Sequence, residues 1–300
     1  MSAIPQSFAS TGAMHVIGNL LEQRTGQQIA ANRAWRVETV LKPVLRANDL
    51  DTLDQLIGRL AAERNGALAE SVVDALLNHE TSFFRDAAVL DLVVEAAQAL
   101  QAETPGRRLR IWSAGCSMGQ EPYSLAMALR EMSKELAGWR VEIVATDISN
   151  EVLEKARSGI YSQFEVQRGL PVMLLIKYFA QVGEMWQIAP ELRAMVQFKQ
   201  LNLLHPFSQL GSFDIVYCRN VLIYFDQETK IDVLDRIADV IEDDGYLALG
   251  GAETVVGLTR AFQPVPDKRG LYAPASAVND KPASNVISLS ARLAMANAAR

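Results

Sequence analysis

The hydrophobic pattern changes along the chain and predicts two structural regions. Between residues 14 and 78, apolar residues recur three and four positions apart, the spacing that places them on one face of a helix. Leu53, Leu56 and Leu60 belong to one such set, and Asp51 or Thr52 would cap the helix that carries them. The pattern predicts an all-helical region over residues 1–78.

From residue 109 onward, short apolar runs alternate with helical patterns. Strands that are buried on both faces and separated by helices predict a mostly parallel sheet with right-handed crossovers. This α/β region is expected over residues 79–275, with an inserted subdomain at about 160–197, where aromatic and short apolar pieces break the alternation. The apolar runs are LRIWSA (109–114), VEIVATDI (141–148), VQFKQLNLL (196–204), FDIVYCRNVLIYF (213–225) and GYLALGG (245–251).

Composition and charge narrow the class of protein. The 300 residues are 49% hydrophobic and 21% charged, enough for a medium and a small domain, and residues 276–300 have the composition of a flexible tail. The net charge of -6 argues against a nucleic-acid partner, because proteins that bind phosphate backbones usually carry a basic surplus. No apolar run reaches the roughly 18 residues of a membrane span, so we expect a cytoplasmic protein without direct membrane insertion.

The cysteines and histidines favour neither a disulfide framework nor a metal site. Cys116 and Cys218 are the only cysteines and lie at two different strand-to-loop junctions, so we expect two small buried residues. His15, His79 and His205 show no metal-ligand spacing, and we expect no bound metal.

The segment IWSAGCSMGQEPYS, residues 111–124, predicts a strand, a tight loop and a helix start. Gly115 and Gly119 let the backbone turn closely, and Pro122 suits the first turn of a helix. The glycine spacing matches neither GxGxxG nor GxxxxGK[ST], so a phosphate cradle is not favoured.

Polar residues at the ends of the predicted strands are candidates for ligand binding, because ligands of open parallel sheets bind there. Asp147 could accept hydrogen bonds from the two hydroxyls of a ribose, or cap the following helix, a role that Ser149 already suits. Glu121 lies at a helix start, where it would interact with the helix dipole or with a positive ligand group. Asn202 and Leu203 could meet an adenine edge or simply end a strand. Acids at these positions disfavour a polyphosphate and suit a ligand that carries an amine, a ribose and an adenine but no phosphate. S-adenosylmethionine fits that description.

Five motifs, in this order, closely resemble the chemotaxis-receptor methyltransferases, the CheR family. The resemblance covers residues 20–273 and implies a Rossmann-like S-adenosylmethionine-dependent methyltransferase sheet, an N-terminal all-α domain and a small inserted β-subdomain. It implies methyl transfer from S-adenosylmethionine to glutamates of a chemoreceptor's cytoplasmic domain, with S-adenosylhomocysteine as product, by a monomer. The motifs are NHETSFFRD (78–86), the 111–124 segment, ATDIS (145–149), LNLL (201–204) and YCRNVLIYFD (217–226).

The resemblance also implies the site residues. Arg85 and Tyr224 would be catalytic, and His79 stands where the family usually has asparagine, with Asn78 one position earlier. The residues implied to bind the cofactor are His79, Thr81, Arg85, Glu121, Asp147, Asn202, Leu203, Cys218, Arg219 and Asn220.

The implied reaction needs no general base, because a glutamate with a pKa near ~4.3 is already ionised at pH 7. We expect Arg85 to orient the substrate carboxylate through its forked donors; the alternative is a surface salt bridge with Asp86 or with other acidic groups of the protein. Tyr224 would orient the methyl group or the acceptor, or else be a half-buried strand tyrosine. Phe83 and Phe84 are expected to pack and fix their segment.

Two regions outside the sheet concern the receptor. The helical region carries two pairs of basic residues whose spacing places each pair on one helix face: Arg33 with Arg36, and Lys42 with Arg46. Such a basic face could dock the acidic methylation helices of a receptor, or it could be solvated surface. In the inserted segment only Gly183 lies between the aromatic pieces, so we expect no tight hold on a receptor C-terminal peptide.

Three other functions share some of these sequence features. A nucleic-acid methyltransferase would carry an Asp/Asn-Pro-Pro-aromatic motif where this chain has CRNVLIYF. A non-catalytic module would bind the cofactor without turnover, although Arg85 and Tyr224 favour an enzyme. Methylation of a receptor outside chemotaxis is not separated from the favoured function by the sequence.

Overall fold

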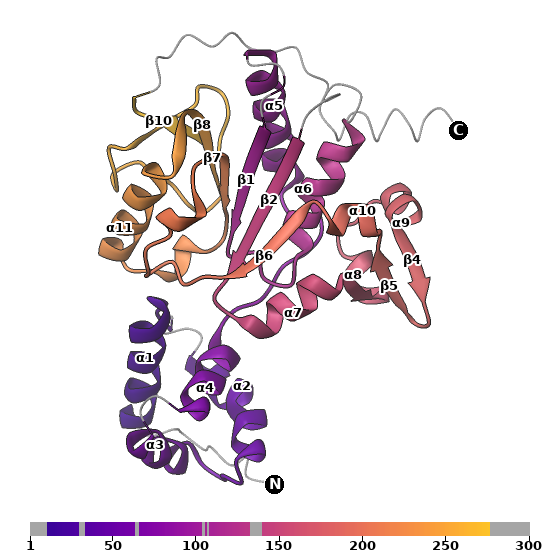
Figure 1. Ribbon diagram of the computed structural model, residues 1–300. Coiled ribbons are helices and arrows are strands. Elements are labelled where there is room, and N and C mark those ends of the chain that lie inside the picture. The colour runs from indigo at the N-terminus through magenta and orange to yellow at the C-terminus, as the bar shows by residue number, and fades with distance from the viewer. Residues whose placement is uncertain are drawn as a thin grey trace, which may run out of the picture. The chain divides into compact units, whose positions relative to one another are not determined.

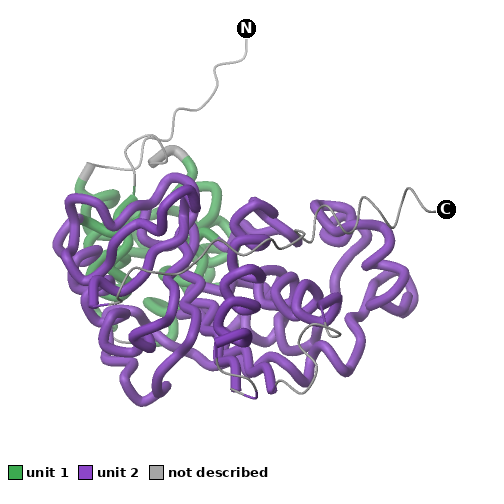
Figure 2. The backbone as a smooth tube through the Cα atoms, turned by 90° about the horizontal axis from the view of Figure 1, so that it is seen from above, with its two compact units in different colours: residues 1–78, 224–226 green, residues 79–223, 227–300 purple. Residues whose placement is uncertain are grey.

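The computed structural model describes residues 11–29, 34–63, 66–103, 106, 108–132 and 140–276. The chain forms two compact units, shown in different colours in Figure 2. Unit 1 comprises residues 1–78 and 224–226, and unit 2 comprises residues 79–223 and 227–300. Arg33 and the expected tail from residue 277 onward lie outside the described residues.

Unit 1 is helical, as the apolar spacing predicts. Ile17, Leu41, Leu56 and Val72 are fully buried, one from each of its helices, and form the centre of its core. The capping box of Thr52 begins the third helix: Gln55 N donates to the Thr52 hydroxyl, and the Gln55 side chain accepts from Thr52 N. The helices are α1 (Thr11–Thr25), α2 (Ala34–Ala47), α3 (Leu53–Ala62) and α4 (Ala67–Leu76).

Unit 2 is built on a seven-stranded sheet with the order β6-β2-β1-β7-β8-β10-β9 (Figure 1). The first five strands in this order run parallel, while β10 runs antiparallel to both β8 and β9. The predicted mostly parallel sheet is therefore confirmed. Its strands are β1 (Arg108–Ala114), β2 (Arg140–Asp147), β6 (Val196–Gln200), β7 (Phe213–Cys218), β8 (Ile241–Leu249), β9 (Phe262–Pro264) and β10 (Leu271–Pro274).

Helices cover the sheet, which explains why its strands are apolar on both sides. Ile111 and Ile143 lie opposite each other in register and pack into one core with Val93 and Leu125 of two helices. Trp112, the neighbour of Ile111, is also fully buried and lies 4.8 Å, ring to ring, from Phe207. In Figure 1, α6 and α7 lie beside β2 and β6, and α11 lies beside β7 and β8. The helices are α5 (Ala87–Glu103), α6 (Gln120–Glu131), α7 (Asn150–Ser158) and α11 (Gln227–Ala238).

The inserted subdomain forms a separate three-stranded antiparallel sheet of order β3-β5-β4. Tyr161, Tyr178 and Phe179 are buried and join the core of the main sheet, so the insertion is packed onto unit 2. The main sheet resumes with β6 at Val196. The subdomain contains β3 (Ile160–Ser162), α8 (Gln163–Gln167), α9 (Val172–Tyr178), β4 (Phe179–Val182), β5 (Met185–Ile188) and α10 (Pro190–Arg193).

Two short 3-10 helices flank β7 in the described chain: η2 (Ser208–Leu210) and η3 (Leu222–Tyr224). Within the part of the chain that the structure describes, none of the helices has both the length and the hydrophobicity of a membrane span.

Candidate functional site

The candidate site lies where the parallel strands of unit 2 end. Strands β6, β2, β1 and β7 are neighbours and parallel, so the segments that follow them meet at one edge of the sheet. This edge brings together the loop 115–119 after β1, Asp147 at the end of β2, Asn202 after β6 and Arg219 after β7. The sequence-predicted residues of unit 2 at these strand ends therefore share one rim.

The loop 115–119 is held close to its neighbours by two glycines with positive φ. Gly115 has φ 75°, and a Cβ there would lie 2.4 Å from Cγ2 of Val221; Gly119 has φ 91°, and a Cβ there would lie 2.9 Å from Cβ of Ala156. The N–H groups of Gly115 and Cys116 both donate to the Thr146 carbonyl, at 2.8 and 2.9 Å. Only glycine permits this close approach, which fixes the loop against the end of β2.

Asp147 is a buried carboxylate whose oxygens are both oriented by main-chain donors. Ser117 N donates to Oδ2 at 2.8 Å, and Ser149 N donates to Oδ1 at 3.1 Å. Burial raises the pKa of Asp147, and these two hydrogen bonds counteract the rise. The hydroxyl of Ser149 accepts from Val152 N and caps α7, as predicted. Each Asp147 oxygen has a second lone pair, which fits a ribose hydroxyl.

Glu121 lies in the first turn of α6, but burial governs its charge. Burial raises its pKa to about 7, although Arg219 and the hydrogen bond from Ser113 lower it. The Ser113 hydroxyl donates to Oε1 at 2.9 Å, and Nη1 of Arg219 lies 3.7 Å from Oε2. A carboxylate that is costly to ionise gains from an added positive group, so Glu121 fits the ammonium group of a ligand better than a helix-dipole role.

Arg219 connects Glu121 to the segment 79–86. Its side chain is buried and forms an ion pair with Asp86. Nη1 also donates to the carbonyl of Arg85 at 3.0 Å and to the hydroxyl of Tyr217 at 3.1 Å. Asp86 is thus an ion-pair partner of Arg219, a contact that the sequence did not predict.

The segment 79–86 is fastened to the same rim. The Ser117 hydroxyl donates to the His79 carbonyl at 2.8 Å, and Phe84 N donates to the Ser124 hydroxyl at 2.9 Å. Phe83 is fully buried, so it fixes the segment by packing, as expected. Arg85 uses one of its five N–H donors for the carbonyl of Glu80, at 3.1 Å. Thr81 is half-buried in this segment.

Sequence reasoning missed Glu253, which supports the segment after β7. Its Oε2 accepts from Asn220 N at 2.7 Å and from Gly250 N at 2.8 Å, and its Oε1 accepts from Val221 N at 3.0 Å. These bonds hold Asn220 at φ 59°, in the left-handed region. The sequence signal for such a residue is weak, because Glu253 lies 33 positions after Asn220.

The remaining predicted residues of unit 2 lie at strand ends. The Asn202 side chain accepts from Leu204 N at 3.0 Å, and the carbonyl of buried Leu203 accepts from Nη2 of Arg236 at 2.7 Å. Cys218, the last residue of β7, and Cys116 are free and buried, and burial raises the pKa of both thiols well above the ordinary value. They are therefore poor nucleophiles.

Tyr224 belongs to unit 1 by its contacts, unlike the other candidate residues. Asn78 Nδ2 donates to its hydroxyl at 2.5 Å, and its carbonyl accepts from Gln28 N at 2.9 Å. Asn78, one position before the His79 that departs from the family motif, thus contacts the predicted catalytic tyrosine.

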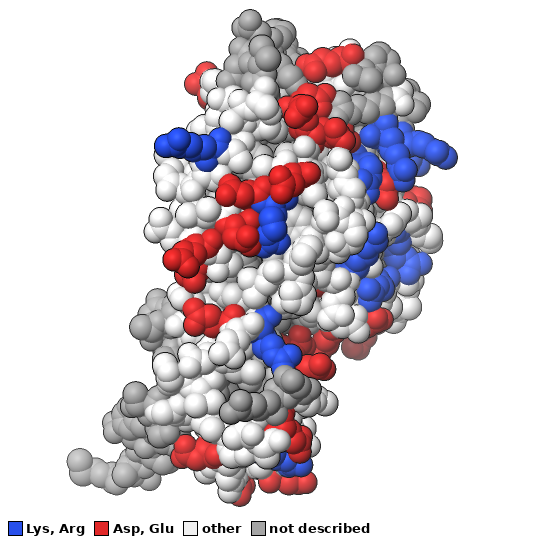
Figure 3. Space-filling model, turned by 60° about the vertical axis from the view of Figure 1, so that its left-hand side comes forward, with Lys and Arg blue, Asp and Glu red and all other residues white. Residues whose placement is uncertain are grey.

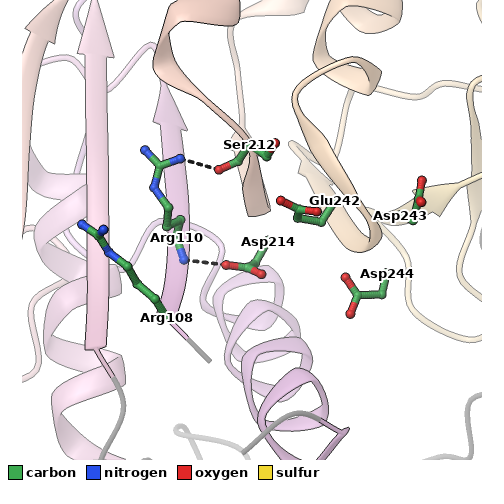
Figure 4. A pocket seen from close by; sticks show the side chains of 7 residues that line it. All are labelled: Arg108, Arg110, Ser212, Asp214, Glu242, Asp243 and Asp244. Atoms are coloured by element: carbon green, nitrogen blue, oxygen red, sulfur yellow. Dashed lines mark hydrogen bonds between the residues drawn. The ribbon is translucent and has the colours of Figure 1, made fainter. Parts of the chain in front are cut away.

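A pocket of about 440 Å³ lies at the opposite edge of the sheet, at the amino ends of the strands (Figure 4). The main-chain N–H of Arg110 donates to the Asp214 carboxylate. The Arg110 guanidinium donates to the Glu142 carboxylate and to the carbonyls of Leu210 and Ser212. These bonds join the starts of β1 and β7, which is a structural role. The residues that line the pocket are Arg108, Arg110, Ser212, Asp214, Glu242, Asp243 and Asp244.

The chemistry of the carboxyl-end rim fits an adenosyl ligand that carries an amine and lacks phosphates. Two buried carboxylates, Asp147 and Glu121, suit hydroxyl and ammonium groups and would repel a polyphosphate. Across the described residues, no group of three His, Cys, Asp or Glu side chains could hold a metal ion.

Comparison with known proteins decides the family. The model of the CheR methyltransferase, SAM binding domain, matches residues 79–271. The chain belongs to the CheR methyltransferase family. It is therefore an S-adenosylmethionine-dependent methyltransferase, and the family, fold class and cofactor expected from the sequence are confirmed.

Relatives in this family match most of the chain. Chemotaxis protein methyltransferase 1 of Pseudomonas aeruginosa is 40% identical over 256 residues, which are 84% of this chain and 93% of the relative. Chemotaxis protein methyltransferase Cher2 of Pseudomonas putida is 38% identical over the same shares. The solved structure of the plantazolicin methyltransferase BpumL in complex with SAH is similar over 79% of this chain and 61% of its own, at 12% identity and a TM-score of 0.36.

Proposed function

We propose that this CheR family member transfers a methyl group from S-adenosylmethionine to glutamate side chains in the cytoplasmic domain of a chemoreceptor. The products are glutamate methyl esters and S-adenosylhomocysteine. The names of the relatives, which are chemotaxis protein methyltransferases, support this substrate class. The observation that carries the proposal is the pair of buried carboxylates at the carboxyl-end rim, within a chain that matches the family over residues 79–271.

The rim residues would hold the parts of the cofactor. Asp147, oriented by two main-chain donors, would bind the ribose hydroxyls, and Glu121 would bind the ammonium group. Asn202 and Leu203 would line the adenine. The other proposed cofactor contacts are His79, Thr81 and Arg85 from segment 79–86, and Cys218, Arg219 and Asn220 from the end of β7.

The chain's own residues would act mainly by orientation. When bound, S-adenosylmethionine supplies an electrophilic methyl group next to a sulfonium charge. A receptor glutamate is already ionised at pH 7, so the protein needs no group to remove a proton. Arg85 would hold this carboxylate through two of its donors, and Tyr224 would add a hydrogen bond near the methyl group. Alignment of this kind can contribute roughly 7–11 kcal/mol to a barrier.

The surface argues against the nucleic-acid alternative. The net charge is -6, whereas a protein that binds nucleic acid usually carries a basic surplus. On the face shown in Figure 3, acidic side chains cover much of the upper middle and most basic side chains lie along the right-hand side. Together with the names of the relatives, the negative net charge favours a protein substrate.

Transfer of labelled methyl groups tests the proposal. The full-length protein is incubated with S-adenosylmethionine labelled in the methyl group and with purified cytoplasmic domains of candidate receptors. We expect label on receptor glutamates, located by mass spectrometry of peptides and released by mild alkali, as methyl esters are.

Two variants control this experiment. Arg85→Ala should reduce transfer by about a hundredfold or more, because alignment is lost, while S-adenosylhomocysteine affinity changes by less than about tenfold. Asp147→Ala should weaken the affinity itself. Binding without any transfer to receptors would instead favour the non-catalytic module, and label on nucleic acid would contradict the proposed substrate.

A further inference from the structure

Tyr161 links the inserted subdomain to two parts of the candidate cofactor site. It lies in β3, the first strand of the subdomain, and its side chain is fully buried. We propose that Tyr161 is a positioning residue, which sets the place of both the loop 115–119 and the segment 79–86. This inference rests on the proposed cofactor site at the carboxyl-end rim.

The hydroxyl of Tyr161 holds the loop 115–119. It donates to the Met118 carbonyl at 2.8 Å. The next residue, Gly119, comes so close that a Cβ would lie 3.0 Å from the Tyr161 hydroxyl. Gly119 is the N-cap of α6, and Glu121 follows two residues later. The tyrosine hydroxyl therefore fixes the turn that delivers Glu121 to the rim.

The ring of Tyr161 packs against the segment 79–86. Its centroid lies 5.0 Å from that of Phe83, with the rings edge to face. Phe83 makes a similar contact with Phe179 of β4, at 5.6 Å. Edge-to-face pairs of this kind are favourable beyond the area that they bury. Because Phe83 lies two residues before Arg85, the ring contact bears on the place of the proposed substrate-orienting side chain.

One side chain from the insertion thus supports two segments that are far apart in sequence. The loop carries Ser117, whose N–H orients Asp147 and whose hydroxyl binds the His79 carbonyl. A loop released from Tyr161 would loosen both bonds at once. Binding of an adenosyl ligand would then have to restore the loop's position, and this cost would appear as lower affinity.

Tyr123 provides a matched control for the hydroxyl of Tyr161. It is also fully buried, and its hydroxyl donates to the main-chain carbonyl of Ala156 in α7 at 2.9 Å. Burial raises the pKa of both tyrosines, so both remain neutral donors near pH 7. Tyr161→Phe and Tyr123→Phe therefore each remove one buried hydrogen bond to a carbonyl, but only the first bond reaches the loop 115–119.

Calorimetric titration with S-adenosylhomocysteine and amide hydrogen exchange of the full-length variants test the inference. Tyr161→Phe should weaken binding about three- to tenfold and speed exchange in residues 115–119. Tyr123→Phe should leave the affinity within about twofold of the wild type, with a similar loss of thermal stability. The similar loss of stability ensures that a change in affinity is not a general effect of removing a buried hydrogen bond.

The outcomes separate this inference from the site on which it rests. Equal affinities and equal loop exchange in the two variants would overturn the role of Tyr161, provided that Asp147→Ala weakens binding. If Asp147→Ala binds as tightly as the wild type, the proposed site itself is wrong, and the inference falls with it.

Discussion

Burial has the largest effect on the pKa of Glu121. Burial raises the pKa of this carboxyl from the ordinary 4.5 to about 7, so the protonated form is favoured to a higher pH than in an exposed glutamate. A raised pKa means that the folded state binds more protons than the unfolded state between about pH 4.5 and 7. The stability that this group contributes is therefore present at low pH and lost as the pH rises through about 7.

A bound ammonium group should shift Glu121 from its protonated form towards its ionised form. It favours the ionised carboxylate, lowers the pKa of Glu121 in the complex and makes binding release a proton. We expect S-adenosylhomocysteine affinity to rise with pH, by up to about tenfold per unit, and to level off above about pH 7. Calorimetry in buffers of different ionisation enthalpy would measure both the affinity and the proton released.

Glu121→Gln gives the control for this pH dependence. The amide does not titrate, so the variant should bind weakly at every pH and release little or no proton. A pH profile unchanged by the substitution would show that another group, such as Asp147, is responsible, and would remove Glu121 from contact with the ammonium group.

The sequence predicted site residues whose side chains would act directly, but not those that act through the main chain. Asp147 and Glu121 were recognisable because each is an acid at a strand end or helix start. Glu253 binds only main-chain N–H groups, which any residue can supply, so no pattern near Asn220 points to it. The sequence does not indicate a positioning role for Tyr161 either, because an aromatic residue in an apolar stretch is typical of a hydrophobic core.

At the scale of elements, the sequence predicted the strands β1, β2, β6, β7 and β8 of the main sheet and missed β9 and β10. β1, β2, β7 and β8 carry apolar residues on both faces and have six to nine residues each, which makes them distinct. β9 and β10 have three and four residues, and each ends in a proline, Pro264 and Pro274. Such short strands form because an existing sheet edge is available for pairing. The local sequence contains no signal for that edge.

The inserted subdomain meets segment 79–86 through Gly169 as well as through Tyr161. Gly169 has φ 89°, and a Cβ there would lie 2.1 Å from the carbonyl oxygen of Phe83. Arg168, its neighbour, pairs with Glu80 of the same segment at 2.6 Å. The contact is with main chain, so the segment itself must move if a side chain is added at Gly169.

We therefore expect Gly169→Ala to shift the segment 79–86. Backbone strain and overlap together should cost about 2–4 kcal/mol of stability and weaken S-adenosylhomocysteine binding. Gly183, in the same subdomain, also has positive φ, 62°, but nothing lies within 4 Å of its Cβ position. Thermal unfolding and calorimetry of both variants separate strain from overlap.

Gly183→Ala should lose only about 1 kcal/mol of stability and keep the wild-type affinity. If both alanine variants bind the ligand like the wild type, the subdomain contact at Gly169 serves stability alone. If both bind more weakly by the same factor, the effect comes from strain inside the subdomain and not from contact with the segment.

At the scale of the whole molecule, the proposed receptor substrate would need a surface to bind beyond the cofactor rim. Unit 1 carries Arg36, Lys42 and Arg46 on the exposed side of α2, opposite to buried Val37, Leu41 and Val44. The helical spacing predicted a shared face for Lys42 and Arg46; Arg33, which the spacing paired with Arg36, lies outside the described residues. Whether basic residues on such a face bind a partner does not follow from spacing, because solvated helices carry the same residues.

We expect these basic residues to dock the acidic methylation helices of the receptor. The double variant Lys42→Glu/Arg46→Glu should lower kcat/KM for receptor methylation about tenfold at low salt, because attraction becomes repulsion. Affinity for S-adenosylhomocysteine should not change, since the cofactor contacts proposed on the rim belong to unit 2. Added salt should reduce the difference between variant and wild type, because salt screens exposed charges.

Arg260→Glu/Arg269→Glu makes the same change in net charge on exposed residues of unit 2 and serves as the control. A docking face on α2 requires the first double variant to lose methylation while the second retains it. Equal losses would attribute the effect to overall charge, and no loss in either would mean that the basic side of α2 is ordinary solvated surface. Because both variants keep the rim intact, each outcome bears on receptor recognition and not on the chemistry of methyl transfer.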